Sequence, residues 1–477
     1  MSAFSEQLNA CVNLYVERSS GSKNALIDAC QVNRSTFFQC MRGSRVPTES
    51  FFQTLLQLLQ LAPGEEAKLR KLYHIAQIGE NVYRSRLRVE KSLEAIATLS
   101  GEGIPQIHQF SGAAHINATC IAINGENQVF QELCYLVQAE TFLEHPQIDL
   151  FLPLRSSSFF EYLKVLYRGC EGKVVRLRQL IQFSRKKEKK AEECMDFFDS
   201  ILFVLASKCR GYEAYYYYAE AKPSDVIGIL YPYSAKTSTG VLFINEKMDQ
   251  GLFASTQEIL NACQGQFEET IGKAKQFSTT IYGPEQIREA FVGFWKKNNH
   301  VWHFFSTPCI GGYLTDALLE KYHLKELHPR FSVCCRDLEQ WGRYTCFCSA
   351  KGLLDFARNG IFPDVPEGTL RPLDMADRKT ILEAMLYQPQ ENCQLYLVDE
   401  NKLPLSNKYV LCISKDHQIV AYHRALPNVR IHCFKEQNLL DAFTDYFQAL
   451  TTSQVILPQE EAEQALKEAI ACCSQEC

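Results

Sequence analysis

Residues 24–73 read NALIDACQVNRSTFFQCMRGSRVPTESFFQTLLQLLQLAPGEEAKLRKLY. Apolar residues at helical spacing predict a helix over residues 23–30, and a short polar turn follows at residues 31–33. A second short helix is predicted over residues 34–42, with Gly43 as its C-terminal stop. Two short helices joined by such a tight turn make a helix-turn-helix motif.

Three further helices complete an expected five-helix, all-α domain over residues 1–80. One precedes the motif, because apolar residues recur at helical spacing over residues 4–16. Thr48 can cap an apolar helix over residues 51–61, and a proline at the first helical position opens another over residues 62–79. These helices supply the apolar faces that a small domain needs in order to bury a core.

The whole run resembles the Cro and phage-repressor helix-turn-helix family, often called XRE. It follows that family's order of short helix, turn, recognition helix, Gly, Pro and apolar helix, and the likeness covers about a sixth of the chain. One residue departs from the pattern, since Gln31 stands where the family's turn usually has Gly. The resemblance implies that the helix over residues 34–42 enters the major groove of DNA.

The resemblance implies two sets of DNA contacts. Arg34, Ser35 and Gln39 are expected to meet base edges, because Arg pairs with guanine and Gln with adenine through two hydrogen bonds each. The alternative is that these side chains are solvated on a module that docks another protein. The residues expected to contact the DNA backbone are Lys23, Arg42, Ser44 and Arg45.

Charge is distributed unevenly along the chain. Residues 1–90 hold 11 Lys and Arg against 8 Asp and Glu, whereas the other 387 residues hold 39 against 47. The basic end is therefore the one suited to phosphates.

Because the sequence has no run of 18 apolar residues and no signal-peptide core, we expect a cytoplasmic protein. The 20 cysteines include no C-x-x-C pair, so we expect reduced thiols and no metal site.

Beyond residue 100 the sequence predicts an α/β region of two similar lobes, which makes the protein multidomain. Short strands and helices alternate there, and a weak internal repeat matches residues 149–169 with residues 344–360. We expect the two lobes to face each other and to bind ligands in the crevice between them. The predicted segments are a helical connector over 81–145, lobe 1 over 146–277, a helical linker over 278–340, and lobe 2 with a C-terminal helix over 341–477.

The connector has apolar residues at near-heptad positions, namely Val82, Val89, Ile96 and Leu99. They span fewer than three heptads, too few to establish a coiled coil. A dimerising helix and a simple linker helix remain equal alternatives.

No catalytic motif stands out in the α/β region. Two-lobed proteins of the phospholipase D type need His-x-Lys followed by Asp in each lobe, but the His-x-Lys of this chain, His323-Leu324-Lys325, has Arg330 at the Asp position. We therefore expect no enzyme and no cofactor.

Two loops that precede helices could hold an anion, although plain N-caps are the alternative. Their residues are Arg155, Ser156, Ser349 and Lys351.

Together these patterns predict a sequence-specific DNA-binding transcription regulator. It would bind double-stranded DNA as a homodimer, because two half-sites give adequate specificity. The α/β region would be a sensor for a small-molecule or anionic effector, or a dimerisation region. The alternative is an interaction scaffold that uses the helix-turn-helix to dock a protein partner.

Overall fold

The chain divides into two compact units, Met1–Leu87 and Arg88–Cys477. We call them the reader unit and the C-terminal unit, and each is described by itself. The computed structural model describes residues 2–19, 22–99, 119–154, 156–170, 172–207, 209–219, 230–283, 285–286, 289, 300–324, 343–362, 370–388, 393–415, 417–423 and 430–473.

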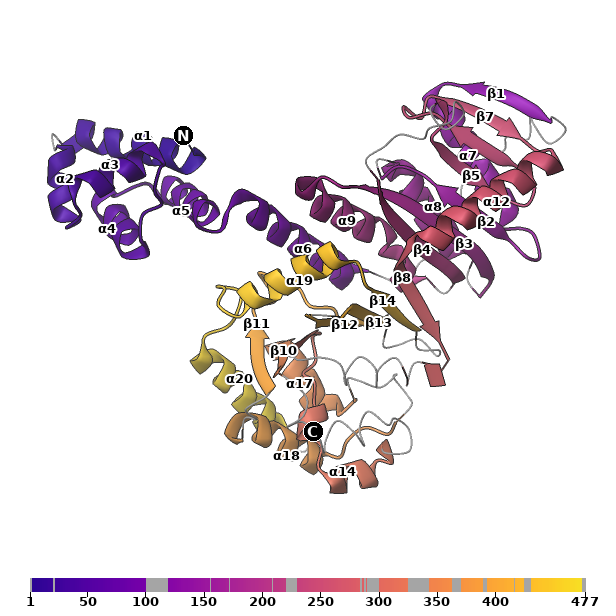
Figure 1. Ribbon diagram of the computed structural model, residues 1–477. Helices are drawn as coiled ribbons and strands as arrows, with labels where there is room; N and C mark the ends of the chain where they lie inside the picture. Colours follow the sequence, from indigo (N-terminus) through magenta and orange to yellow (C-terminus); the bar gives the residue numbers. More distant parts are fainter. Residues whose placement is uncertain are drawn as a thin grey trace. The chain divides into compact units, whose positions relative to one another are not determined.

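The reader unit is helical in the part that the structure describes (Figure 1). Its helices lie where the sequence predicts them, with ends that differ by a few residues. They are α1 (Ala3–Ser19), α2 (Lys23–Ala29), α3 (Arg34–Arg42), α4 (Glu49–Leu59) and α5 (Pro63–Ile78).

Aromatic side chains hold the core of the reader unit together. The Phe52 ring stacks on the Tyr73 ring with centroids 3.8 Å apart, and Phe4 packs on both. The Tyr73 hydroxyl donates a 2.9 Å hydrogen bond to the Pro47 carbonyl, so this buried polar group is satisfied. Helices α1, α4 and α5 thus form the support on which the helix-turn-helix rests, with Phe37 of α3 fully buried against it.

Helix α6 (Glu80–Thr98) begins in the reader unit and ends in the C-terminal unit. Within the C-terminal unit, Val89, Leu93 and Ile96 are buried in its main apolar core. Arg88 also pairs with Glu192, at 2.8 Å, and Ser92 donates to Asp199, both on a neighbouring helix. Because these apolar residues are used inside the chain, the structure favours the linker-helix alternative for this segment.

In the residues that the structure describes, the C-terminal unit is built on one 14-stranded sheet that runs through both predicted lobes. In spatial order its strands are β1 (Cys120–Asn124), β7 (Gln250–Ala254), β6 (Val241–Ile244), β5 (Tyr233–Lys236), β2 (Gln147–Phe151), β3 (Val174–Ser184), β4 (Arg210–Ala219), β8 (Lys275–Tyr282), β14 (Arg430–Phe434), β13 (Ile419–His423), β12 (Tyr409–Ser414), β9 (His300–Phe304), β10 (Arg343–Ser349) and β11 (Cys393–Val398).

Strand directions divide the sheet into two sets. Strands β2, β3 and β4 are parallel to one another, and so are β9, β10 and β11. The strands between the two sets pair antiparallel, so the second set runs opposite to the first. The junction of β4 with β8 is short: three residue pairs, Ala214 with Ser278, Tyr215 with Gln276 and Tyr216 with Lys275, interrupted by a register shift.

Helices cover both faces of the sheet (Figure 1). One face carries α7 (Glu126–Glu140), α8 (Ser157–Gly169), α9 (Lys187–Ile201), α10 (Phe203–Ala206) and α19 (Gln437–Leu450), whose buried side chains share one core with α6. The other face carries α12 (Gln257–Lys273) over the first strands, and α14 (Asp316–Lys321), α17 (Ala350–Asn359), α18 (Met375–Tyr387) and α20 (Gln459–Cys472) over the last ones. Among the described helices, none has the length and apolar content to cross a bilayer.

A buried ion pair lies between the sheet and α12. The Arg178 guanidinium donates to both carboxylate oxygens of Asp149, at 2.7 and 2.9 Å, and to Glu268 of α12 at 2.8 Å. The Arg178 side chain is only 3% exposed and the Asp149 side chain 1%. The Arg178–Asp149 pair therefore faces away from solvent, and Glu268, whose side chain is 48% exposed, links α12 to this pair.

Three expectations about this region are wrong. The connector over 81–145 is not purely helical, because β1 lies in it and pairs with β7. The linker over 278–340 is not purely helical either, since His300–Phe304 forms β9, which lies between β12 and β10. The lobes do not face each other across a crevice, because backbone hydrogen bonds join their strands into one sheet.

Candidate nucleic-acid interface

The turn between α2 and α3 needs an unusual backbone conformation. Gln31 has φ 52°, in the left-handed region that favours glycine. Asn33 then caps α3, because its side-chain oxygen accepts a 2.7 Å hydrogen bond from the Thr36 N–H. The chain thus makes the tight helix-to-helix turn with Gln at the position where the XRE-type pattern has Gly.

Gly43 ends α3, as the sequence predicts. Its φ is 74°, and the Ser44 N–H donates a 3.0 Å hydrogen bond to the Gln39 carbonyl, which closes the helix C-terminus. A Cβ atom at Gly43 would stand 2.7 Å from the Ser5 hydroxyl oxygen of α1. Both the conformation and this close approach therefore require glycine, and they fix the direction in which α3 projects.

The outer face of α3 carries the predicted base-reading residues unequally. Arg34 and Ser35 are exposed, but Gln39 is half-buried. Phe37, Cys40 and Met41 form the inner face and are buried in the core of the reader unit. The first turn of α3 is therefore more accessible to a partner than its last turn.

A shallow hollow of about 490 Å³ lies on this outer face, lined by Arg34, Ser35, Phe38 and Arg42. The Arg34 guanidinium lies 5.8 Å from the centre of the Phe38 ring. Arg42 Nε donates a 3.2 Å hydrogen bond to the Phe38 carbonyl. Sequence reasoning missed Phe38, although its spacing of four residues from both arginines puts it on their face of the helix.

The residues predicted to contact the DNA backbone surround this helix. Arg42, Ser44 and Arg45 are exposed at or beyond the end of α3, and Lys23 is half-buried in the first turn of α2. The Ser44 hydroxyl donates to the Gln39 carbonyl at 3.1 Å, so its own hydrogen is already used. Within the described part of the reader unit, none of the cations Lys23, Arg34, Arg42 and Arg45 forms an ion pair.

The described residues of the two predicted anion loops make local contacts, and whether the loops bind an anion stays a prediction. Ser349 is buried, and its hydroxyl accepts a 2.9 Å hydrogen bond from the Gly352 N–H, which makes it an N-cap of α17. The Ser156 hydroxyl lies 3.1 Å from the Met248 sulfur instead. Lys351 is exposed, and Arg155 lies outside the described residues. Ser156 and Ser349 thus each make a local structural contact.

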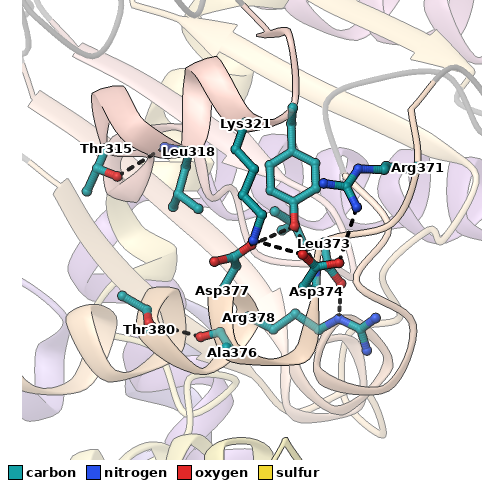
Figure 2. Close-up of polar contacts among 11 residues, drawn as sticks. Thr315, Leu318, Lys321, Arg371, Leu373, Asp374, Ala376, Asp377, Arg378 and Thr380 are labelled. Atoms are coloured by element: carbon teal, nitrogen blue, oxygen red, sulfur yellow. Dashed lines mark hydrogen bonds and ion pairs between the residues drawn. The ribbon is translucent and has the colours of Figure 1, made fainter.

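A separate charged cluster joins α14 to α18 (Figure 2). Lys321 Nζ lies 2.8 Å from Asp374 and 2.6 Å from Asp377, and the Tyr322 hydroxyl donates to Asp377 at 2.6 Å. The Lys321 ammonium is the main cause that holds the pKa of Asp374 below its ordinary value. The cluster is a network of satisfied ion pairs that fastens two helices. Among the described residues, no three His, Cys, Asp or Glu side chains are placed to hold a metal ion.

Comparisons with known proteins add little. No family model and no curated protein matches the chain. One similar solved structure is TrmBL2, an archaeal chromatin protein with a novel mode of DNA binding: 13% identity, 48% of this chain, 84% of that chain, TM-score 0.22. Another is phosphatidylserine synthase of Haemophilus influenzae: 12% identity, 73% of this chain, 92% of that chain, TM-score 0.23. At these TM-scores neither likeness bears on function.

Proposed function

We propose that the chain is a sequence-specific DNA-binding transcription regulator of XRE-like type, with α3 as its recognition helix. The observation that carries the proposal is the outer face of α3. There Arg34, Ser35 and Arg42 are exposed together, and the arginines form no ion pair with any described residue. A basic helix face without carboxylate partners is complementary in charge to a polyanion such as DNA.

The geometry of the motif suits a major groove, which is wide enough to admit one α-helix. Arg34 and Ser35 lie in the first turn of α3, where recognition helices of this kind meet base edges. Gln39 lies in the second half of α3 and is half-buried, so only the exposed part of its side chain could contact a base. The cations that would bind phosphates on either side are Lys23, Arg42 and Arg45, with Ser44 beside them.

A selection from random duplexes tests this function directly. The full chain should enrich one sequence over background in a gel shift, and the affinity should fall steeply as salt rises, because phosphate contacts release counterions. Binding without any sequence preference at low salt would contradict the proposal. Capture of a specific protein through the α3 face, with no DNA preference, would support the docking-module alternative instead.

We further propose that the chain acts as a homodimer. One helix-turn-helix covers only part of a helical turn of DNA, and two half-sites about 34 Å apart are the usual solution. The selected sequence should then be a palindrome. A monomer by light scattering at micromolar concentration, with and without the selected duplex, would contradict this.

The C-terminal unit is proposed to contain two similar lobes. We match the strands of the two halves in chain order, β1 with β8, β2 with β9, and so on to β7 with β14. Under this match both halves have the same spatial order, which is β1-β7-β6-β5-β2-β3-β4 in the first half and β8-β14-β13-β12-β9-β10-β11 in the second. Each half also has three parallel strands at its far end. This match pairs β2 with β9, one strand earlier than the sequence repeat, which paired β2 with β10.

We also propose that this unit senses a small molecule, and anionic ligands are the first candidates to test. This proposed role includes no catalytic step and no cofactor. In open α/β sheets, ligands bind beyond the carboxyl ends of parallel strands. An effector that prefers one state of the unit would shift the population of DNA-competent molecules. A thermal-shift screen of phosphorylated and carboxylated metabolites on the full chain tests this. If no compound alters stability, and deletion of residues 100–477 leaves DNA binding and transcription unchanged, the sensor role is wrong.

A further inference from the structure

We propose that Phe38 reads the 5-methyl group of thymine, so that the DNA site contains a thymine whose methyl group contributes to binding. The inference rests on the proposed function, DNA binding through α3. It adds a specificity-determining residue and names the base that this residue selects.

The position of Phe38 is the first support. Its ring is only half-buried and lies in the hollow with Arg34, Ser35 and Arg42. The ring is not loose on the surface, because it packs against the buried Phe37 ring, edge to face, with centroids 5.6 Å apart. An anchored aromatic ring in the middle of a basic face offers a partner a rigid apolar contact.

The direction of the side chain is the second support. Long side chains in an α-helix lean toward the helix N-terminus, so residue 38 covers the surface above the preceding turn. The Arg34 guanidinium lies 5.8 Å from the Phe38 ring centre, which places the ring beside that first turn. Arg34 and Ser35 are the residues expected to meet base edges, so Phe38 shares their part of the groove.

The chemistry of the major groove then selects the base. Guanine, adenine and cytosine present hydrogen-bond donors and acceptors there, whereas thymine also presents a methyl group. A phenyl ring pressed against a donor or acceptor would leave it unpaired, which is costly. Contact with the thymine methyl removes apolar surface from water on both sides and leaves no such group unpaired.

The charges on each side of Phe38 favour a nucleic acid over an apolar protein surface. Arg34 and Arg42 flank the ring and form no ion pair among the described residues. A partner that covers Phe38 must therefore also accept two cations within one short helix. Duplex DNA provides phosphates and guanine edges at that spacing together with the methyl group.

Deoxyuridine substitution tests the proposal, because uracil lacks only the methyl group. In the duplex selected by the full chain, each thymine is replaced in turn, and Kd is measured by fluorescence anisotropy. Loss of one buried methyl should weaken binding about fourfold at one thymine of each half-site. With Phe38→Ala the thymine and uracil duplexes should bind equally. Phe38→Leu, which keeps an apolar side chain, should retain part of the difference.

The outcomes separate this proposal from the function on which it rests. Sequence-specific binding without any uracil-sensitive thymine would overturn the role of Phe38 and leave the regulator intact, whereas binding without sequence preference would overturn both. A thymine preference that survives in Phe38→Ala would also overturn it. The control Phe142→Ala changes an aromatic residue that is 69% exposed in the C-terminal unit, and it should leave the thymine preference unchanged. If Phe38→Ala fails to fold, the wild type and Phe38→Leu still decide the matter.

Discussion

Arginine is used in opposite ways in the two units. In the reader unit, Arg34 and Arg42 lie exposed on one helix face and form no ion pair among the described residues. In the C-terminal unit, Arg178 is buried and bonded to Asp149 and Glu268. A buried cation must be paired to be tolerated, whereas an exposed one keeps its charge available to a partner. The contrast indicates which arginines serve the fold and which can serve binding.

The largest expected effect is on stability, at Arg178. Arg178→Met should lower the free energy of unfolding by about 3 to 5 kcal/mol, because it leaves Asp149 buried without its partner. Urea denaturation of the full chain measures this. Lys273→Met removes an exposed partner of Glu269 on the same covering helix and should leave stability unchanged. Equal effects of the two substitutions would contradict the distinction between buried and exposed charges.

The second prediction concerns pH and a buried histidine. Burial, with a smaller effect of Arg430, lowers the pKa of His432 from its ordinary 6.5 to about 3. The folded protein therefore keeps the imidazole neutral while the unfolded chain takes up a proton below pH 6.5. The contribution of neutral His432 to the free energy of unfolding is fully present above pH 6.5. It is lost as pH falls toward 3, and the loss is about 2 kcal/mol at pH 5.

Thermal unfolding at pH 7 and pH 5 measures this loss. His432→Gln should lose less stability than the wild type between these pH values. Phe142→Ala, at an exposed residue of the same unit that does not titrate, should lose as much as the wild type. If His432→Gln showed the full wild-type loss, the burial argument for this histidine would fail.

The third prediction separates base contacts from backbone contacts in the reader unit. Arg34→Ala should weaken binding to the selected duplex by about 1 to 3 kcal/mol and relax the preference at one base pair. Lys23→Ala should weaken binding to all duplexes alike and reduce the salt slope by about one. Anisotropy titrations at several salt concentrations distinguish the two. An unchanged site preference in Arg34→Ala would mean that α3 enters the groove in another register.

The smallest expected effect is at the turn of the motif. Gln31→Gly should stabilise the reader unit by about 0.5 to 1 kcal/mol, because glycine adopts the left-handed conformation without steric cost. Gln57→Gly, at an exposed position inside α4, should destabilise by about 1 kcal/mol. Opposite signs in chemical denaturation are expected. Destabilisation by both would argue against a strained Gln31.

The reader unit could be predicted from sequence because its signals are local. Asn33 and Gly43 mark the ends of α3, and apolar spacing marks the buried faces, so the helices were located correctly. Phe38 was missed although its spacing of four residues from Arg34 and Arg42 puts it on the outer face, because an aromatic residue next to Phe37 is more often part of the core. Whether Arg34, Ser35 and Gln39 read bases stays a prediction until DNA binding is measured.

The C-terminal sheet could not be predicted to the same extent because its pairings are distant in sequence. The apolar run that forms β9 is short, and a short apolar run does not distinguish strand from helix. Its partners, β10 and β12, begin at Arg343 and Tyr409, far along the chain. The pairing of β4 with β8 likewise depends on contacts between residues far apart in sequence. The sequence therefore did not predict that the two sets of strands form one continuous sheet.

The short junction between β4 and β8 has a consequence for local opening. Nine residue pairs join β3 to β4, but only three join β4 to β8, and a register shift interrupts them. Amide hydrogens at this junction should therefore exchange with solvent faster than those of the β3–β4 ladder, since opening there breaks fewer hydrogen bonds. The sheet thus has a line of low protection between its two sets of strands, at which backbone pairing can open locally while the shared apolar core on one face stays packed across it.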